Sequence, residues 1–153
     1  MALQTTYKET MDAGRPGQIV NTETKNLISR AAGAAVGLGK FVVFGGLDGS
    51  CRQLTSGDVA DDVLGISARE RSLDANNVDT FAAGDNVRVM TQGVIWVTVS
   101  DAVSYGDPVR IDPVTGNVFG AGATSGEQFV LDKNRAEFDS SAASGAVAKI
   151  RLK

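Results

Sequence analysis

The chain has 153 residues, of which 42% are hydrophobic and 22% charged, and its formal net charge is −3. This size and balance predict one soluble domain and exclude collagen-like, wholly disordered and membrane-spanning chains. Direct nucleic-acid binding is disfavoured, because it requires a basic surface against phosphate and the sequence has no run of Lys and Arg.

Residues 1–30 differ in pattern from the rest of the chain. The opening Met1–Thr10 is polar and lacks the apolar core of a secretory signal, so we expect synthesis in the cytoplasm. The apolar residues of this segment are isolated, and it gains little by folding against its own domain. It is either a frayed terminus or, as we predict, an extended N-terminal arm that orders on a partner. The candidate contact residues of this arm are Tyr7, Met11, Arg15, Pro16, Ile19 and Val20.

Residues 31–153 are expected to form a single all-β domain, because short apolar runs alternate with glycine-rich turns. The first clear strand is Phe41–Phe44, which ends at a pair of glycines. Two further strand patterns, Val87–Thr91 and Val94–Val99, are separated by Gly93. A single glycine between two strands indicates a tight hairpin or a bulge.

A loose repeat supports a small barrel of hairpins. The motif Gly-Asp-x-Val-Arg-(Val/Ile) occurs at Gly84–Val89 and again at Gly106–Ile111. We interpret each Gly-Asp pair as a turn that leads into a strand, since Asp bonds nearby backbone and Gly allows positive φ. The final strand, Ala148–Leu152, alternates apolar and basic side chains with period two.

The catalytic and metal-binding groups that the sequence offers are few. It has no histidine, so Ser–His and Cys–His nucleophile pairs and most zinc sites are unavailable. The only cysteine, Cys51, has no partner for an internal disulfide. Asp61 and Asp62 could in principle act as a glycosidase pair, but neighbouring residues in a polar stretch tend to diverge. We therefore expect no enzyme, no cofactor and no bound metal.

The order of several short motifs resembles that of a known family. These motifs are Gly14–Val20 (GRPGQIV), Ala34–Val43, Val63–Glu70, Phe81–Val97, Val103–Val109 and Gly145–Leu152. Together they are similar to the structural cement, or head decoration, proteins of tailed bacteriophages. Each motif is a simple turn-and-strand pattern, and their succession from Gly14 to the C-terminus carries the resemblance.

The resemblance implies a β-barrel or β-tulip (β-clip-like) body with an extended N-terminal arm. It implies a protein made in the host cytoplasm that binds the outer surface of the virion capsid through the major capsid protein. Such proteins hold neighbouring capsomers together as homo-oligomers, with a trimer expected here and a dimer as the alternative. Another virion structural role, in a tail or fibre, is the second hypothesis for the function.

Overall fold

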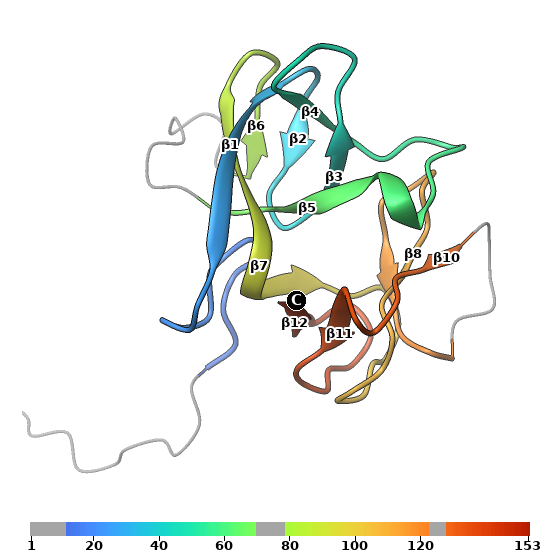
Figure 1. Cartoon of the computed structure of the whole chain (residues 1–153). Coiled ribbons are helices and arrows are strands. Elements are labelled where there is room, and N and C mark those ends of the chain that lie inside the picture. Colours follow the sequence, from blue (N-terminus) through green and yellow to red (C-terminus); the bar gives the residue numbers. More distant parts are fainter. Residues whose placement is uncertain (1–11, 70–78, 123–127) are drawn as a thin grey trace, which may run out of the picture.

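The computed structural model describes residues 12–69, 79–122 and 128–153, and within them the all-β prediction is confirmed (Figure 1). The regular elements are β1 (Asn26–Ala32), β2 (Val36–Gly37), β3 (Phe41–Phe44), β4 (Ser50–Gln53), the 3-10 helix η1 (Ala60–Asp62), β5 (Val63–Ser67), β6 (Thr80–Phe81), β7 (Asn86–Thr98), β8 (Arg110–Ile111), β9 (Val118–Phe119), β10 (Phe129–Val130), β11 (Ala136–Phe138) and β12 (Val147–Leu152).

The predicted barrel is present and has five strands. The main sheet has the order β1-β4-β3-β5-β7-β12-β11, and a further pairing between β1 and β7 closes its first five strands into a ring. Strands β12 and β11 continue the sheet outside this ring. A three-stranded sheet, β10-β8-β9, and the short β2–β6 pair complete the body.

Strand β7 connects the barrel to the C-terminal half of the molecule. It is 13 residues long, and its first half pairs with β1 and β5 while its second half pairs with β12. Gly93 marks the change of direction, with φ of +124°, in the region where the register against β1 shifts between Met90 and Gln92. The sequence left a hairpin or a bulge open at this glycine, and the structure shows one continuous, irregular strand.

Two hydrophobic cores lie on opposite faces of the barrel strands. One joins apolar side chains from all five barrel strands, which places it inside the ring; its buried members are Ala32, Val36, Leu38, Val42, Cys51, Phe81, Val87 and Val89. The larger core contains alternate residues of the same strands, such as Phe41, Ile66 and Met90, packed against the C-terminal strands. Because side chains alternate along a strand, each barrel strand serves both cores.

The expected boundary between arm and body, at residues 30 and 31, falls within β1. Asn26 to Ala31 pair with β7 in antiparallel register, and Ala31 and Ala32 pair with β4 in parallel. The barrel therefore uses the last residues of the segment that the sequence assigned to the arm.

Candidate functional site

The segment Gly14–Val20, here called the arm root, lies along the second half of β7. β12 occupies one edge of this part of β7, and the arm root lies along the other through an antiparallel bridge between Ile19 and Ile95. Three backbone hydrogen bonds join them: Gly17 N–H to Trp96 O at 2.8 Å, Trp96 N–H to Gln18 O at 3.0 Å, and Val20 N–H to Val94 O at 3.0 Å. The start of the described chain is thus attached to the same strand that helps to close the barrel.

Two glycines allow the arm root to lie against the body at close range. Gly17 and Gly39 both have positive φ, +79° and +65°, and their backbones touch. A Cβ on Gly39 would lie 2.6 Å from the Gly17 nitrogen, a distance that real Cβ atoms do not reach. The Gly17 carbonyl accepts a hydrogen bond from Arg69 N–H at 2.7 Å, and Gly39 N–H donates to Ser67 O at 2.9 Å. The end of β5 therefore holds both glycines.

The only tryptophan of the chain lies under the arm root. Trp96 is 7% exposed, and a Cβ on Gly14 would meet its indole ring at 2.4 Å. The Lys149 ammonium, from β12, lies 5.3 Å from the ring centroid, within the range of a cation–π contact. Trp96 is thus buried beneath the arm root and reports on the contact between arm root and body.

Ion pairs attach the segment between the arm root and β1 to the C-terminal strand. Arg151 of β12 lies 2.6 Å from the Glu23 carboxylate and 3.1 Å from that of Asp139. The hydrogen bond from Arg151 holds the pKa of Glu23 below its ordinary value, while both carboxylates raise the pKa of Arg151. An interaction across 128 residues of sequence therefore fixes the path of the chain as it leaves the arm root.

The six arm residues that the sequence singled out are placed differently. Tyr7 and Met11 lie outside the described residues. Arg15 is exposed, with its backbone N–H bonded to the side chain of Gln18. The other three are half-buried: Ile19 packs against the larger core opposite Ile95, and Pro16 and Val20 lie on either side of it in the arm root.

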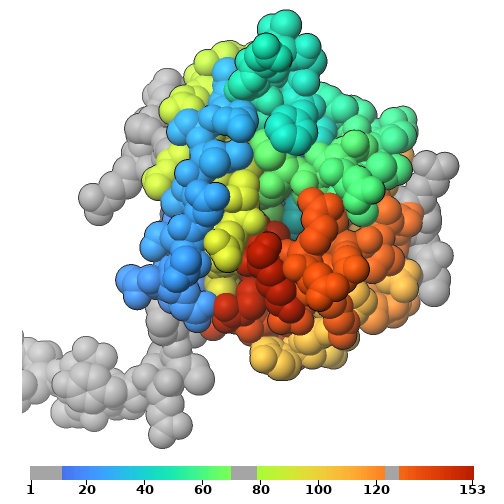
Figure 2. Space-filling view, in the orientation of Figure 1, coloured from blue at the N-terminus to red at the C-terminus, as the bar shows by residue number. Residues whose placement is uncertain are grey.

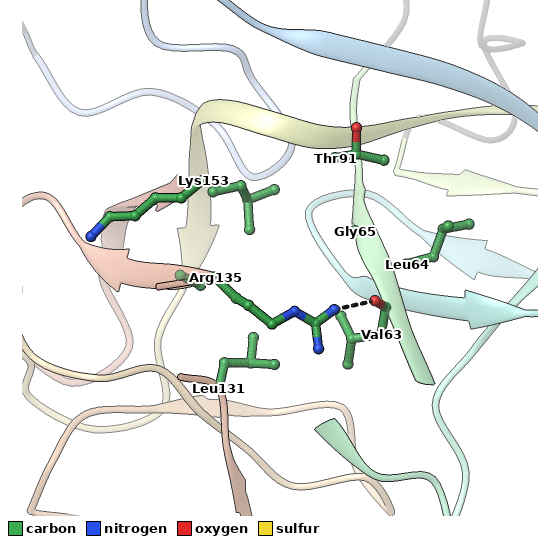
Figure 3. A pocket seen from close by; sticks show the side chains of 9 residues that line it. Val63, Leu64, Gly65, Thr91, Leu131, Arg135 and Lys153 are labelled. Atoms are coloured by element: carbon green, nitrogen blue, oxygen red, sulfur yellow. Dashed lines mark hydrogen bonds between the residues drawn. The ribbon is translucent and has the colours of Figure 1, made fainter. Parts of the chain in front are cut away.

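The Asp61–Asp62 pair and a small cavity beside β5 resemble functional sites, but their polar groups make contacts within the protein. Asp62 caps η1 by accepting the Val59 N–H at 2.9 Å, and Asp61 is fully exposed, 3.9 Å from Arg135. A cavity of about 120 Å³ lies beside β5 and β7. Figure 3 shows Arg135 among the side chains that line it. Its guanidinium donates to the carbonyls of Ala60 and Val63 at 2.5 and 2.8 Å, which ties this loop to the C-terminal half.

Among the residues that the structure describes, no three His, Cys, Asp or Glu side chains are grouped so that they could hold a metal ion. Within the same ranges we find no helix with the length and hydrophobicity of a membrane span. Burial raises the pKa of the Cys51 thiol, which lies inside the barrel.

Sequence reasoning missed the long-range arginine contacts. Arg135 and Arg151 carry no local motif, and Arg151 stood out only as a polar position of an alternating strand. The sequence marked the arm root only weakly, by the Gly-x-x-Gly spacing around Pro16. Its attachment to β7 uses backbone groups, so the pattern of side chains does not predict it.

Comparison with known proteins agrees with this architecture. The family model described as structural cement protein (E217 gp24/Pam3 gp6) matches residues 3–153, nearly the whole sequence. The chain therefore belongs to the structural cement protein family, whose members are phage structural proteins associated with the capsid. No curated protein gives a significant match.

Matches to solved structures include two phage proteins. A chain from the capsid of Myoviridae phage XM1 superimposes with a TM-score of 0.71 at 19% identity, covering 100% of this chain and 98% of that one. The N base of head fibre gp8.5 of bacteriophage phi29 gives a TM-score of 0.46 at 13% identity, over 85% of this chain and 95% of that one. The first of these supports the fold of the whole chain.

Proposed function

We propose that this protein is a capsid cement protein that binds the outer surface of a tailed-phage head and stabilises contacts between neighbouring capsomers of the major capsid protein. The family match over residues 3–153 carries the proposal. Cementing requires many weak contacts repeated by symmetry and no reacting group, so the protein acts by binding and is not an enzyme. It is synthesised in the host cytoplasm and needs no cofactor.

The arm root supports this function physically. A flexible tether transmits force poorly, whereas here the start of the described chain is bonded to β7 and packed on Trp96. Arg15 is exposed on the arm root, and Pro16, Ile19 and Val20 keep part of their surface accessible beside it. With Tyr7 and Met11 further towards the N-terminus, these residues form the proposed contact with the shell.

Oligomerisation supplies the remaining affinity. A standard protein interface buries about 1,600 Å² in total, and an extended segment reaches this with few residues. In a homo-oligomer, for which we propose a trimer, each arm that binds raises the effective concentration of the others. Modest single contacts then hold a shell together.

Removal of residues 2–13 tests the function, because it leaves the arm root in place. Heads prepared without the protein are mixed with the full chain or the truncated variant, and binding is measured by sedimentation. We expect at least about tenfold weaker binding of the variant, with unchanged Trp96 fluorescence as the control for folding. Equal binding would show that residues 2–13, with Tyr7 and Met11, are not part of the contact.

Placement and stabilisation need separate measurements. Labelled protein is expected on heads in electron micrographs, whereas label on tails or fibres would favour the second hypothesis. Heads that carry the protein should release their DNA at a higher temperature than heads without it. Unchanged release would contradict a cementing role.

A further inference from the structure

Strand β1 has an unpaired edge along most of its length. It pairs with β7 from Asn26 to Ala31, but β4 reaches only Ala31 and Ala32 on the other side. Among the described residues, no strand pairs with that other edge between Asn26 and Arg30. In Figure 2 this stretch, in blue, runs down the exposed front of the molecule below the blue-green β3–β4 hairpin.

The hydrogen-bonding groups of this edge point away from the barrel. Ala32 bonds to the β7 side through Asp85, and the Ala31 N–H bonds to the opposite side through Gly49 O at 3.0 Å. Backbone groups alternate between the two edges of an antiparallel strand, so Leu27 and Ser29 share the outward direction of Ala31. The N–H and C=O of Leu27 and the N–H of Ser29 form a short open ladder that ends at the β3–β4 turn, while the Ser29 carbonyl accepts the Arg30 guanidinium.

The side chains around the open edge are mostly basic and apolar, with the exposed Asp48 as the acidic residue of the β3–β4 turn. Lys25 precedes it, and Arg30 lies at its upper end, where its guanidinium donates to the Ser29 carbonyl at 2.9 Å. The β3–β4 hairpin above it exposes 60% of Phe44 and 81% of Leu47. The hairpin tip is held rigid, because the Ser50 hydroxyl bonds both the N–H and the carbonyl of Leu47 at 3.1 and 2.6 Å.

We propose that the open edge of β1, from Leu27 to Ser29, is a strand-addition site for an extended segment of a shell subunit that carries an Asp or Glu for Arg30. Exposed sheet edges pair with added strands, and backbone bonding makes few demands on the sequence of the partner. A second copy of this chain fits less well, because edge-to-edge pairing would bring the Lys25 and Arg30 side chains of both copies to one short ladder. The site rests on the proposed binding to the shell and adds a second contact to that of the arm.

Hydrogen exchange of the unmodified protein tests the site directly. In the free protein the amides of Leu27 and Ser29 should exchange fast, while those of Ile28 and Arg30, which face β7, exchange slowly. On heads, the Leu27 and Ser29 amides should become protected. Binding to heads without this protection would overturn the strand-addition site and leave the cement function intact, whereas absence of any binding would overturn both.

The identity of the added strand is tested in the same experiment. If Leu27 and Ser29 are already protected in the free oligomer, and deletion of residues 2–11 removes that protection, the strand is the chain's own arm and the shell segment is wrong. If the added strand comes from the shell, a variant without residues 2–11 that still binds heads should show the same protection of the Leu27 and Ser29 amides as the full chain.

Matched variants test the contacts. Ser29→Pro removes an N–H that none of the described strands uses and blocks an added strand, so binding to heads should weaken by about tenfold. Ser29→Ala keeps the N–H and should bind normally. Arg30→Glu should weaken binding while Arg30→Lys retains most of it. Equal binding of the proline and alanine variants, with native Trp96 fluorescence in both, would contradict the proposal.

Discussion

The barrel and the arm root share β7 but are held by different forces. The first half of β7 contributes side chains such as Val87 and Val89 to a sealed interior, where burial of apolar surface stabilises the fold. The second half holds the arm root through three backbone hydrogen bonds and a glycine contact. The apolar packing inside the barrel is lost only when the domain unfolds. The hydrogen bonds that hold the arm root can break while the barrel stays intact.

The largest effect on the free energy of unfolding is expected in β3, where a buried and an exposed phenylalanine can be compared. Phe41→Ala empties a position that is 1% exposed in the larger core and should lower the free energy of unfolding by about 3–5 kcal/mol. Phe44→Ala, in the same strand but 60% exposed, should change it by less than about 0.5 kcal/mol. Urea unfolding measures both, and similar losses would mean that β3 is not packed as described.

A smaller effect is expected where the arm root meets the body. Gly39→Ala places a methyl group 2.6 Å from the Gly17 nitrogen and should cost about 1–3 kcal/mol. Because it pushes the arm root away from Trp96, the tryptophan emission should shift as well. Gly84→Ala has a similar φ of +89° and open space around it, so it should cost about 1 kcal/mol without a spectral shift. Identical spectra for the two variants would contradict the contact.

Acid should weaken the β4 region through one ion pair. Arg52 binds both carboxylate oxygens of Asp58, at 2.7 and 2.8 Å, and this hydrogen bonding lowers the pKa of Asp58 from 3.8 to about 2. The carboxylate therefore stabilises the fold fully above the unfolded value and loses this contribution as the pH falls through about 2. In Asp58→Asn the stability should fall less steeply over this range, and parallel curves from pH-dependent melting would show that the pair contributes nothing.

The smallest effect is expected at the exposed pair that holds the segment after the arm root. Glu23→Gln removes the charge that Arg151 binds at 2.6 Å, so the arm root should contact Trp96 less tightly while overall stability stays nearly unchanged. Glu137→Gln, which breaks the 3.0 Å pair with Lys153 elsewhere on the C-terminal sheet, is the control. Faster acrylamide quenching of Trp96 should appear in the first variant only.

Local patterns predicted the body of the fold well. The alternation in the last strand is confirmed, with Ala148, Ile150 and Leu152 buried and the residues between them half-buried. The two Gly-Asp repeats form the same turn: the Asp85 carboxylate accepts the Ala82 N–H at 2.8 Å, and the Asp107 carboxylate accepts the Ser104 N–H at 2.9 Å. Periodicity and turn chemistry act over a few residues and are therefore visible in sequence.

The closure of the barrel and the attachment of the arm root were not visible in this way. The sequence places residues 26–30 of β1 in the arm because the apolar residues there are isolated, whereas the place of β1 in the ring depends on pairing with β7 some 60 residues away. The arm root binds through backbone groups that every residue has, so its side chains carry little information about its partner.

The attachment of the arm root to β7 also has a mechanical consequence. A force directed along the axis of the arm root would load its three hydrogen bonds to β7 together, in shear. β7 then distributes the load to β1 and β5 on one side of Gly93 and to β12 on the other. If the arm binds the shell as proposed, swelling of the shell would therefore pull on the whole sheet.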